Sequence, residues 1–336
     1  MQEDRVARIS YLVGSLVLTA LLLGFGWGLV YAYAVKPLLE EGPLRLHALA
    51  SLSPSTAAWW RHLIALAFDV LIIFIAVVGT LYVLGTFYLE APEAGKWRLY
   101  YKRGLASRDR RLPRLTGWQR FQHIWVMITF IICALTGFAA MAGYGSRVTL
   151  LTIHVYSGIA MGVVALLHFG YYTAQLLLAK ARGESLREKF PMLEIYSKRF
   201  VRNVFRVIRG KEPEPMGKYD VEQLFEYWGV YWGMAVLGIP GVVMLLAGND
   251  VLGGIFWTTH TKEAVLAVTF ILMVHLTYAH FRPKVFPLDP TFLTGWMPLR
   301  RAREEHPLWA EKQAGEPGPT EEAGKPAAGK PGTAAT

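Results

Sequence analysis

The stretch LLTIHVYSGIAMGVVALLHFGYY (150–172) is apolar along almost all of its length, yet it contains two histidines, His154 and His168. About 20 consecutive apolar residues are enough for a helix to cross the hydrocarbon core of a bilayer. A polar ring at bilayer depth is costly, so an intramembrane histidine usually has a function. The stretch therefore predicts a membrane-spanning helix that carries two functional side chains.

The whole chain of 336 residues follows the same apolar pattern. It is 53% hydrophobic and has a mean hydropathy of +0.30. Long apolar stretches occupy residues 9–35, 62–89, 118–142, 150–179, 224–247 and 258–281. Backbone polar groups inside a bilayer must be paired within the protein, which helices achieve. We therefore predict an all-α integral membrane protein with six transmembrane helices.

The first apolar stretch also has features of a secretory signal. Arg5 and Arg8 precede it, and the sequence AYA (32–34) resembles a cleavage site. Its apolar core is long for a signal peptide, so we expect a retained helix, with cleavage as the alternative.

The net charge of +10 is distributed unevenly. Residues 90–117 contain eight Lys and Arg, and residues 180–220 contain eleven, whereas Arg147 is the only charged residue of 143–149 and Asp250 the only one of 248–257. Positively charged loops stay in the cytoplasm. This alternation predicts that 90–117 and 180–220 are cytoplasmic, as are both termini if the first helix is retained. It also argues against nucleic acid as the partner.

The pattern divides the chain into four parts. Residues 1–89 form two N-terminal helices with an outer loop, and 90–117 form a basic cytoplasmic loop. Residues 118–297 form a core of four transmembrane helices, and 298–336 form a cytoplasmic tail. From about residue 311 the tail is rich in Pro, Gly and Ala, which predicts disorder. Basic and apolar residues interleave in 180–220, which favours a helix lying on an anionic inner leaflet.

Five histidines lie inside the predicted spans of the core, and a sixth lies at the inner end of the last span. They are His123, His154, His168, His260 and His275, with His280 at the inner end. Helical residues 14 or 15 apart are separated by about 21–22 Å along the axis. Since the fourth and sixth spans run in the same direction, their histidines are expected to meet in two layers. His154 and His260 share the outer layer, and His168 and His275 share the inner layer, which His123 also reaches.

Two layers of facing imidazoles suit two haems, each held by a histidine from either side. Small residues near these layers would let a macrocycle approach the backbone, and candidates are Gly137, Gly158, Gly162 and Gly170. A proton relay is the main rival, but its clearest acidic members, Asp69 and Glu263, do not form a chain. Zinc is disfavoured because acidic or thiol partners are lacking at these depths. The remaining histidines, His47, His62 and His306, are expected to be solvated or interfacial.

The segment 117–297 resembles the haem b membrane subunits of formate dehydrogenase (gamma subunit), nickel–iron hydrogenase and thiosulfate reductase. The resemblance rests on GWQRFQHIWVMITFIICALTGFA (117–139), IHVYSGIAMGVVALLHFGYY (153–172), EYWGVYWGMAVLGIPGVVML (226–245) and HTKEAVLAVTFILMVHLTYAHFRPKVFPLDPTFLTG (260–295). It implies a bacterial or archaeal cytoplasmic membrane protein with a four-helix haem-binding bundle. It also implies electron exchange between a quinone and catalytic or carrier subunits, such as a multihaem cytochrome c or an iron–sulfur, molybdenum or nickel protein.

The resemblance implies two haems b, an outer one on His154 and His260 and an inner one on His123 and His275. This chain departs from that four-ligand pattern because His168 and His280 are extra. The inner haem therefore pairs His275 with either His123 or His168, and six histidines would allow a third haem. Arg282 is assigned to the quinone or to a haem propionate, and further quinone candidates are His280, Lys284, Trp118 and Gln119.

The predicted function is electron transfer, with no catalytic residue in a chain that lacks a substrate domain. A haem-free transporter or proton-conducting subunit is the alternative from another class, and a purely structural anchor is a third. The two N-terminal helices have no counterpart in the four-helix core. They are either a docking element for another membrane subunit or a lipid-facing appendage.

Overall fold

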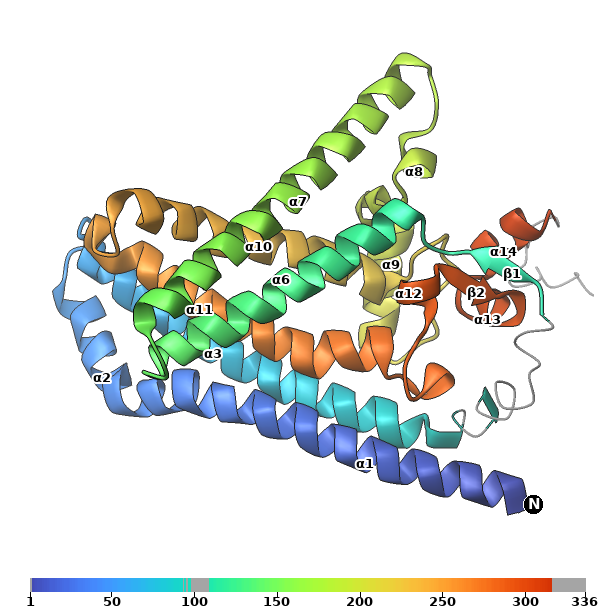
Figure 1. Ribbon diagram of the computed structural model, residues 1–336, viewed down its shortest axis with the longest axis horizontal. Coiled ribbons are helices and arrows are strands. Elements are labelled where there is room, and N and C mark those ends of the chain that lie inside the picture. Colours follow the sequence, from blue (N-terminus) through green and yellow to red (C-terminus); the bar gives the residue numbers. More distant parts are fainter. Residues whose placement is uncertain (1, 93, 95, 98–108, 316–336) are drawn as a thin grey trace, which may run out of the picture.

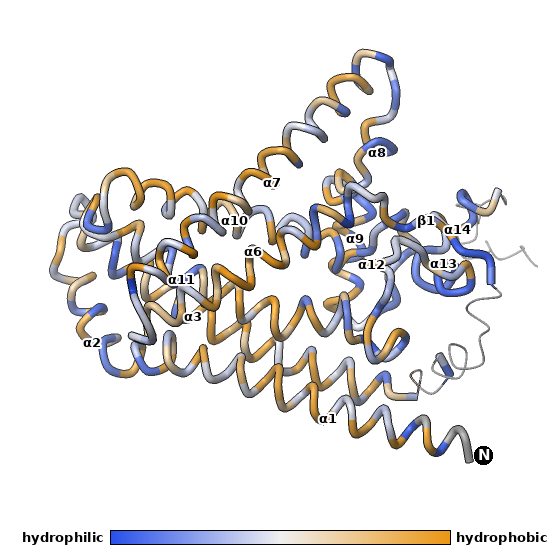
Figure 2. Tube along the Cα trace, viewed as in Figure 1, coloured by the Kyte–Doolittle hydropathy of each residue, from blue (hydrophilic) through white to orange (hydrophobic). Residues whose placement is uncertain are grey.

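The computed structural model describes residues 2–92, 94, 96–97 and 109–315. Six of its helical segments are long and apolar enough to cross a membrane (Figure 1). Figure 2 shows apolar residues along the middle of these segments and hydrophilic residues toward the two ends of the molecule. The prediction of an all-α membrane protein with six spans is confirmed.

The first span is longer than its apolar stretch. Helix α1 (Gln2–Val30) continues through a π-helical turn, η1 (Tyr31–Val35), into α2 (Lys36–Ser51). The sequence suggested an outer loop at 36–61, and most of that segment is helical instead. The reason is a buried anchor, because the Arg45 guanidinium reaches inward to the Asp69 carboxylate of α3 (Ala57–Leu84).

Hydrogen-bonding caps set the starts of the core helices. A Thr116 capping box with Gln119 opens α6 (Gly117–Met141), and Ser146 opens α7 (Arg147–Ala181). Asp220 accepts a hydrogen bond from the Gln223 amide at the start of α10 (Val221–Ala247). Such side chains satisfy amide groups that have no partner within the helix. The last span comprises η4 (Val251–Gly254), α11 (Ile255–Phe270) and the π-helical segment η5 (Ile271–His280).

Shorter elements gather at the end of the molecule where α1 begins (Figure 1). Between α7 and α10 lie α8 (Leu186–Lys189), η3 (Pro191–Tyr196) and α9 (Lys198–Ile208). After η5 come η6 (Pro283–Val285), α12 (Thr291–Thr294), α13 (Leu299–Glu305) and α14 (Pro307–Ala314). A π-helical turn η2 (Gly85–Leu89) ends the second span, and strand β1 (Arg111–Pro113) pairs antiparallel with β2 (Trp296–Pro298). The tail is thus folded as far as Gly315, and its remaining residues, 316–336, lie outside the described part.

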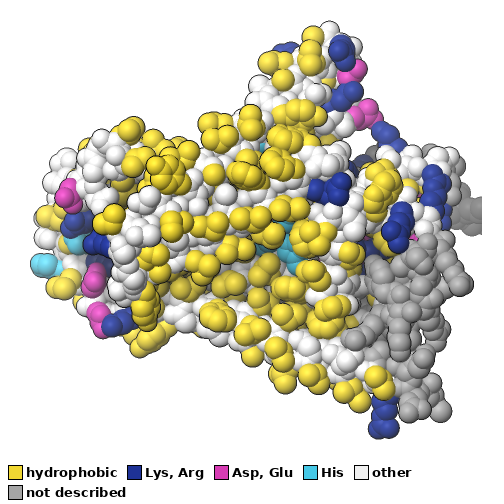
Figure 3. All heavy atoms as spheres, in the orientation of Figure 1, with side chains coloured by type: hydrophobic (Ala, Val, Ile, Leu, Met, Phe, Trp, Pro, Cys, Tyr) yellow, Lys and Arg dark blue, Asp and Glu magenta, His cyan; other side chains and the backbone are white. Residues whose placement is uncertain are grey.

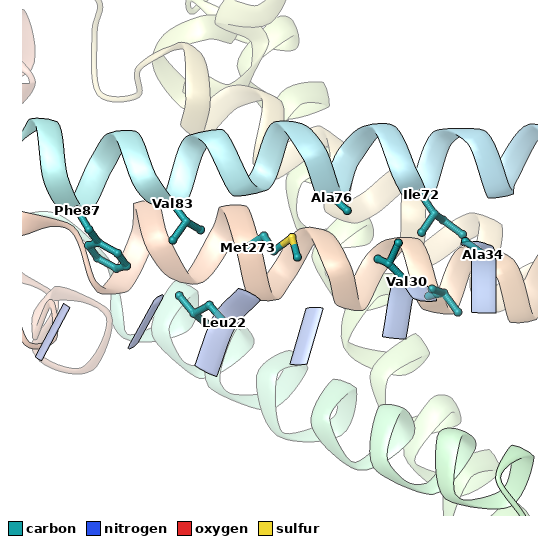
Figure 4. Close-up of a cluster of buried hydrophobic side chains, with 9 residues drawn as sticks. Leu22, Val30, Ala34, Ile72, Ala76, Val83, Phe87 and Met273 are labelled. Atoms are coloured by element: carbon teal, nitrogen blue, oxygen red, sulfur yellow. The ribbon is translucent and has the colours of Figure 1, made fainter. Parts of the chain in front are cut away.

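The N-terminal helices pack against the last span rather than standing apart. Their shared core contains Leu22, Val30, Ala34, Ile72, Ala76, Val83, Phe87, Val265 and Met273 (Figure 4). Met273 fits against two glycines, because a Cβ at Gly26 or Gly79 would lie only 2.3 Å or 2.7 Å from its atoms. The two helices therefore support α11 and η5, the segment that carries three of the histidines.

The other core helices are much less enclosed by protein. Very few residues in the apolar parts of α7 and α10 are buried within the protein, whereas about a third of those in the last span are. A broad apolar belt covers the face shown in Figure 3, and charged side chains gather toward its two ends. Lipid contact explains apolar side chains on the outside of a spanning bundle. The last span is the centre of the fold.

Candidate functional site

His154, near the start of α7, and His260, near the start of α11, face each other. Their ring centroids are 5.9 Å apart, with the ring planes at 79°. His154 Nδ1 donates to the Cys133 carbonyl at 2.9 Å, and His260 Nδ1 donates to the Leu237 carbonyl at 2.9 Å. These bonds fix the tautomer that leaves Nε2 with a lone pair for a ligand. We call this pair the outer site.

The outer site is built twice from the same parts. Helices α6 and α7 form one hairpin, and α10 and α11 form the other. In each hairpin, the histidine on the second helix donates to a backbone carbonyl on the first helix. Four residues after that carbonyl comes a glycine, Gly137 or Gly241. A Cβ at Gly137 would lie 3.1 Å from the His154 ring, and one at Gly241 would lie 3.5 Å from the His260 ring. The glycines therefore leave room for the imidazoles on both sides.

Three histidines meet at the other depth of the bundle, and we call them the inner site. His123 of α6 lies 6.3 Å from His275 and 5.7 Å from His280 between ring centroids. His275 and His280 are 5.3 Å apart, and each of the three offers a nitrogen within 4.8 Å of the others. Within the part of the chain that the structure describes, the buried Nδ1 atoms of His123 and His280 have no hydrogen-bond partner.

The π-helical form of η5 explains why two of its histidines share one site. In a regular α-helix, residues five positions apart point in different directions. A π-helix bonds residue i to i+5, which brings residues five positions apart onto nearly the same face. His275 and His280 are separated by five positions and both lie beside His123. Residue spacing alone does not reveal this local widening of the helix.

A carboxylate supports the inner site from α10. His275 Nδ1 donates to Glu226 Oε2 at 3.1 Å. A carboxylate acceptor makes the imidazole a stronger ligand than a backbone carbonyl does. Glu226 was not among the residues predicted to act here, although its position in EYWGVYWG places it at the start of α10.

His168 lies apart from the inner site and has partners on both nitrogens. Its Nδ1 donates to Gln122 Oε1 at 3.2 Å, and its Nε2 accepts from the Tyr227 hydroxyl at 2.5 Å. The ring stacks on Tyr231 with centroids 4.5 Å apart. His168 is therefore held in an aromatic cage between α6, α7 and α10.

Arg282 is directed into an ion-pair network below the inner site. Its guanidinium donates to Glu305 at 2.8 Å, and Arg301 binds Asp289 in bidentate fashion at 3.0 Å and 2.5 Å. Burial alone would raise the pKa of Asp289, but Arg301 and Arg282 outweigh it and hold that pKa below its usual range. The network fixes the segment after η5 beneath the inner site. Lys284 lies 3.9 Å from Glu304 in the same region.

Other predicted quinone candidates also have partners. Gln119 Nε2 donates to the Tyr172 hydroxyl at 3.1 Å. Trp118 stacks on Phe121 with centroids 5.5 Å apart, but its buried Nε1 has no hydrogen-bond partner among the described residues.

The expectation that His306 is solvated is wrong. Its side chain is 1% exposed and lies in the turn between α13 and α14, with Trp309 as an aromatic neighbour. Burial, together with the nearby Arg114, Arg282 and Arg301, lowers the pKa of His306 well below its usual value. Composition predicts disorder from about residue 311, but α14 continues to Ala314, and α13 and α14 pack against β1 through a small apolar core. His47 is exposed, as expected.

Asp69 and Glu263, the two acidic residues considered for a proton relay, lie in different surroundings. Asp69 accepts hydrogen bonds from Arg45 and Lys262, and the Lys262 ammonium also donates to the Tyr33 carbonyl at 2.7 Å. This triad joins α2, α3 and α11. Glu263 is buried on α11 beside Gly233. The contacts of Asp69 are those of a structural ion pair.

The donor set and the spacing of both sites suit a haem. Metal–imidazole bonds are about 2 Å long, so two imidazoles on opposite sides of one ion have ring centres roughly 6 Å apart. The outer pair and the His123–His275 pair have this spacing. Neutral imidazoles from facing helices are common haem ligands. At the inner site, the buried Nδ1 atoms of His123 and His280 have no hydrogen-bond partner among the described residues.

Comparison with known proteins identifies a family for the part of the chain that contains both sites. The model of the family described as prokaryotic cytochrome b561 matches residues 114–310, which include all the helices and histidines of both sites. None of the curated proteins that were compared matches the chain. The match covers more than half of the chain, and it begins just before α6, so the N-terminal helices lie outside it. This chain belongs to the prokaryotic cytochrome b561 family.

Proposed function

We propose that the chain is the membrane subunit of a respiratory oxidoreductase complex and carries electrons between a redox partner on the outer side and the quinone pool. Its family performs haem-based electron transfer in the membrane. The observation that carries the proposal is that one bundle contains two clusters of facing histidines, His154 with His260 and His123 with His275, at different depths. Along the last span, His260 and His275 are separated by about 22 Å, most of the hydrocarbon thickness.

The outer haem b is assigned to His154 and His260. Both side chains have Nδ1 engaged by a backbone carbonyl, which leaves Nε2 as the ligand atom on each side. Haem b, when bound, takes up and releases a single electron at its iron. The chain orients the two rings and, through Gly137 and Gly241, keeps the space beside them clear.

The inner haem b is assigned to His123 and His275. His168 is the weaker candidate because Gln122 and Tyr227 already occupy both of its nitrogens. His280 belongs to the same cluster as His123 and His275, so we propose two haems in total rather than three. Glu226 orients the His275 ring.

Quinone chemistry is assigned to the inner end, next to His280. This side chain is buried and contacts Phe292 at a centroid distance of 4.6 Å, and no described residue hydrogen-bonds to its Nδ1. We assign Arg282 to the ion-pair network rather than to the quinone, because Glu305 already binds its guanidinium. The positive charge of the loops 90–117 and 180–220 supports a cytoplasmic location for this end and for both termini.

A reduced-minus-oxidised absorbance spectrum of the purified protein tests the proposal. We expect haem b bands and a ratio of two haems per chain in protein expressed with haem supplied. A colourless preparation would contradict the proposal and favour a haem-free transporter. A ratio of three would contradict the assignment of His280 to the inner site.

A further inference from the structure

Helix α9 presents three different faces. Phe200 and Asn203 face the protein, where Phe200 packs with Met216, Tyr219, Val221 and Leu224. Asn203 is fully buried. Its side-chain Nδ2 donates to the Glu214 backbone carbonyl at 2.9 Å, and its Oδ1 accepts from the Glu214 backbone N–H at 2.8 Å, which holds the segment after α9 in place. The helix is therefore held firmly at the end of the bundle where α6 and α10 begin (Figure 1).

A second face of α9 is apolar and exposed. Val201, Phe205 and Ile208 follow the i, i+4, i+7 spacing of one helix face and are 50%, 54% and 74% exposed. Three large apolar side chains in a row on a firmly anchored helix need a covering layer. In a membrane protein, a short helix between two spans meets the boundary between headgroups and acyl chains.

The third face of α9 is an arginine stripe. Arg202, Arg206 and Arg209 have the same i, i+4, i+7 spacing, offset by about 100° from the apolar face. Together with Phe205 and Glu214 they line a cavity of about 340 Å³. Residues 198–211 contain six Lys and Arg and no Asp or Glu.

The contacts of the arginine stripe hold its charges in place. Arg202 pairs with Glu214 at 2.9 Å, and the Arg206 Nε donates to the Glu212 carbonyl at 2.7 Å. Arg209 lies over the Phe205 ring at 5.8 Å. Among the described residues, Glu214 supplies the carboxylate that lines this cavity with the three guanidinium groups, so their combined charge there is positive, directly beside the apolar face.

We propose that α9 binds the headgroup of an anionic phospholipid of the inner leaflet, with the phosphate in the arginine-lined cavity and the acyl chains along Val201, Phe205 and Ile208. Arginine forks match phosphate oxygens in geometry and charge. Basic residues next to an amphipathic face are typical of proteins that select anionic lipids. The proposal is independent of the haem assignments.

Native mass spectrometry of the full chain, purified with phosphatidylglycerol or phosphatidylcholine, tests the proposal. The variant R202Q/R206Q/R209Q removes three charges from the stripe. The matched control K180Q/R182Q/R187Q removes three charges from exposed positions in the same loop. We expect wild type and control to retain phosphatidylglycerol in preference to phosphatidylcholine, and the stripe variant to lose that preference by at least roughly tenfold.

Two further measurements make the outcome decisive. V201S/F205S/I208S should weaken retention of long-chain phosphatidylglycerol but not of a short-chain, water-soluble form. Unchanged absorbance and thermal unfolding in each variant show that the fold is intact. Equal retention by the stripe variant and wild type overturns the proposal, as does full displacement of the lipid by millimolar inorganic phosphate, which would indicate a site for soluble anions.

Discussion

The outer and inner sites use histidine in different ways. At the outer site both rings are fixed by backbone carbonyls, which no point mutation removes directly. At the inner site one ring is fixed by a carboxylate, and each of the two others has a buried nitrogen to which none of the described residues hydrogen-bonds. The outer site is therefore specified by helix packing, and the inner site by side chains that sequence changes can alter.

Residues at corresponding positions of the first helices of the two hairpins lie 104 positions apart in the sequence, and comparing them shows where the hairpins differ. Leu237 and Gly241 follow Cys133 and Gly137 by 104 positions each, and Tyr227 follows His123 by the same 104. The outer parts are thus equivalent in both hairpins, whereas at the inner depth one hairpin has His123 and the other has Tyr227. Tyr227 instead bonds His168, which removes that histidine from the pair.

Replacing an outer ligand should have the largest effect. We expect His260→Ala, and equally His154→Ala, to lose one haem of two, because the remaining imidazole cannot hold the group from both sides. Haem-to-protein ratio and the difference spectrum measure the loss. His47→Ala is the matched control, since His47 is exposed and far along the chain from either site. Two haems retained in either ligand variant would contradict the outer assignment.

Variants of His123 and His168 separate the two candidates for the inner haem. We expect His123→Ala to lose the inner haem and His168→Leu to keep both haems. The second change removes two buried hydrogen bonds and should lower the free energy of unfolding by about 1–3 kcal/mol. Haem content and thermal unfolding, measured together, distinguish the roles. Loss of a haem only in His168→Leu would reverse the assignment.

Sequence alone predicted the spans and the pairing of His154 with His260, but at the inner depth it grouped His168 with His275 and His123, whereas the structure groups His280 with them instead. The outer pair was predictable because α-helical spacing and the direction of the helices determine its depth. The choice among His123, His168 and His280 was not, because it depends on the π-helical widening of η5 and on the aromatic cage. These features arise from side-chain packing between helices, which periodicity does not report.

The same limit explains two other differences. His306 was expected to be solvated or interfacial, but it directly follows a buried network in which Arg301 and Glu305 pair with each other and with Asp289 and Arg282. The region after Pro37 lacked a clear apolar stretch, but the buried contact of Arg45 with Asp69 stabilises α2. Ion pairs between distant segments leave no periodic signal in the sequence.

Replacing Glu226 by Gln tests the difference in support between the two sites. Glutamine keeps an acceptor for His275 but removes the negative charge of Glu226. A nearby negative charge stabilises the oxidised form of a metal, so its removal favours the reduced form. We expect the inner haem to become easier to reduce, with a midpoint potential higher by on the order of 60 mV, equal to a tenfold change in a one-electron equilibrium. The outer potential serves as the internal control in a spectroelectrochemical titration. A shift of both potentials, or of neither, would contradict a local role for Glu226.

The smallest expected effect comes from the two equivalent glycines of the outer site. A Cβ at Gly137 would lie 3.1 Å from His154 Cε1, inside the contact distance of carbon atoms, whereas at Gly241 the distance to His260 would be 3.5 Å. We expect Gly137→Ala to displace the His154 ring by a few tenths of an ångström and to lower retention of the outer haem about two- to fivefold. Gly241→Ala should leave haem retention and the spectrum unchanged, because its contact is an ordinary one. Equal effects of the two variants would mean that the outer site adapts to both sides alike, and that packing of the carbonyl-bonded rings does not limit haem binding there.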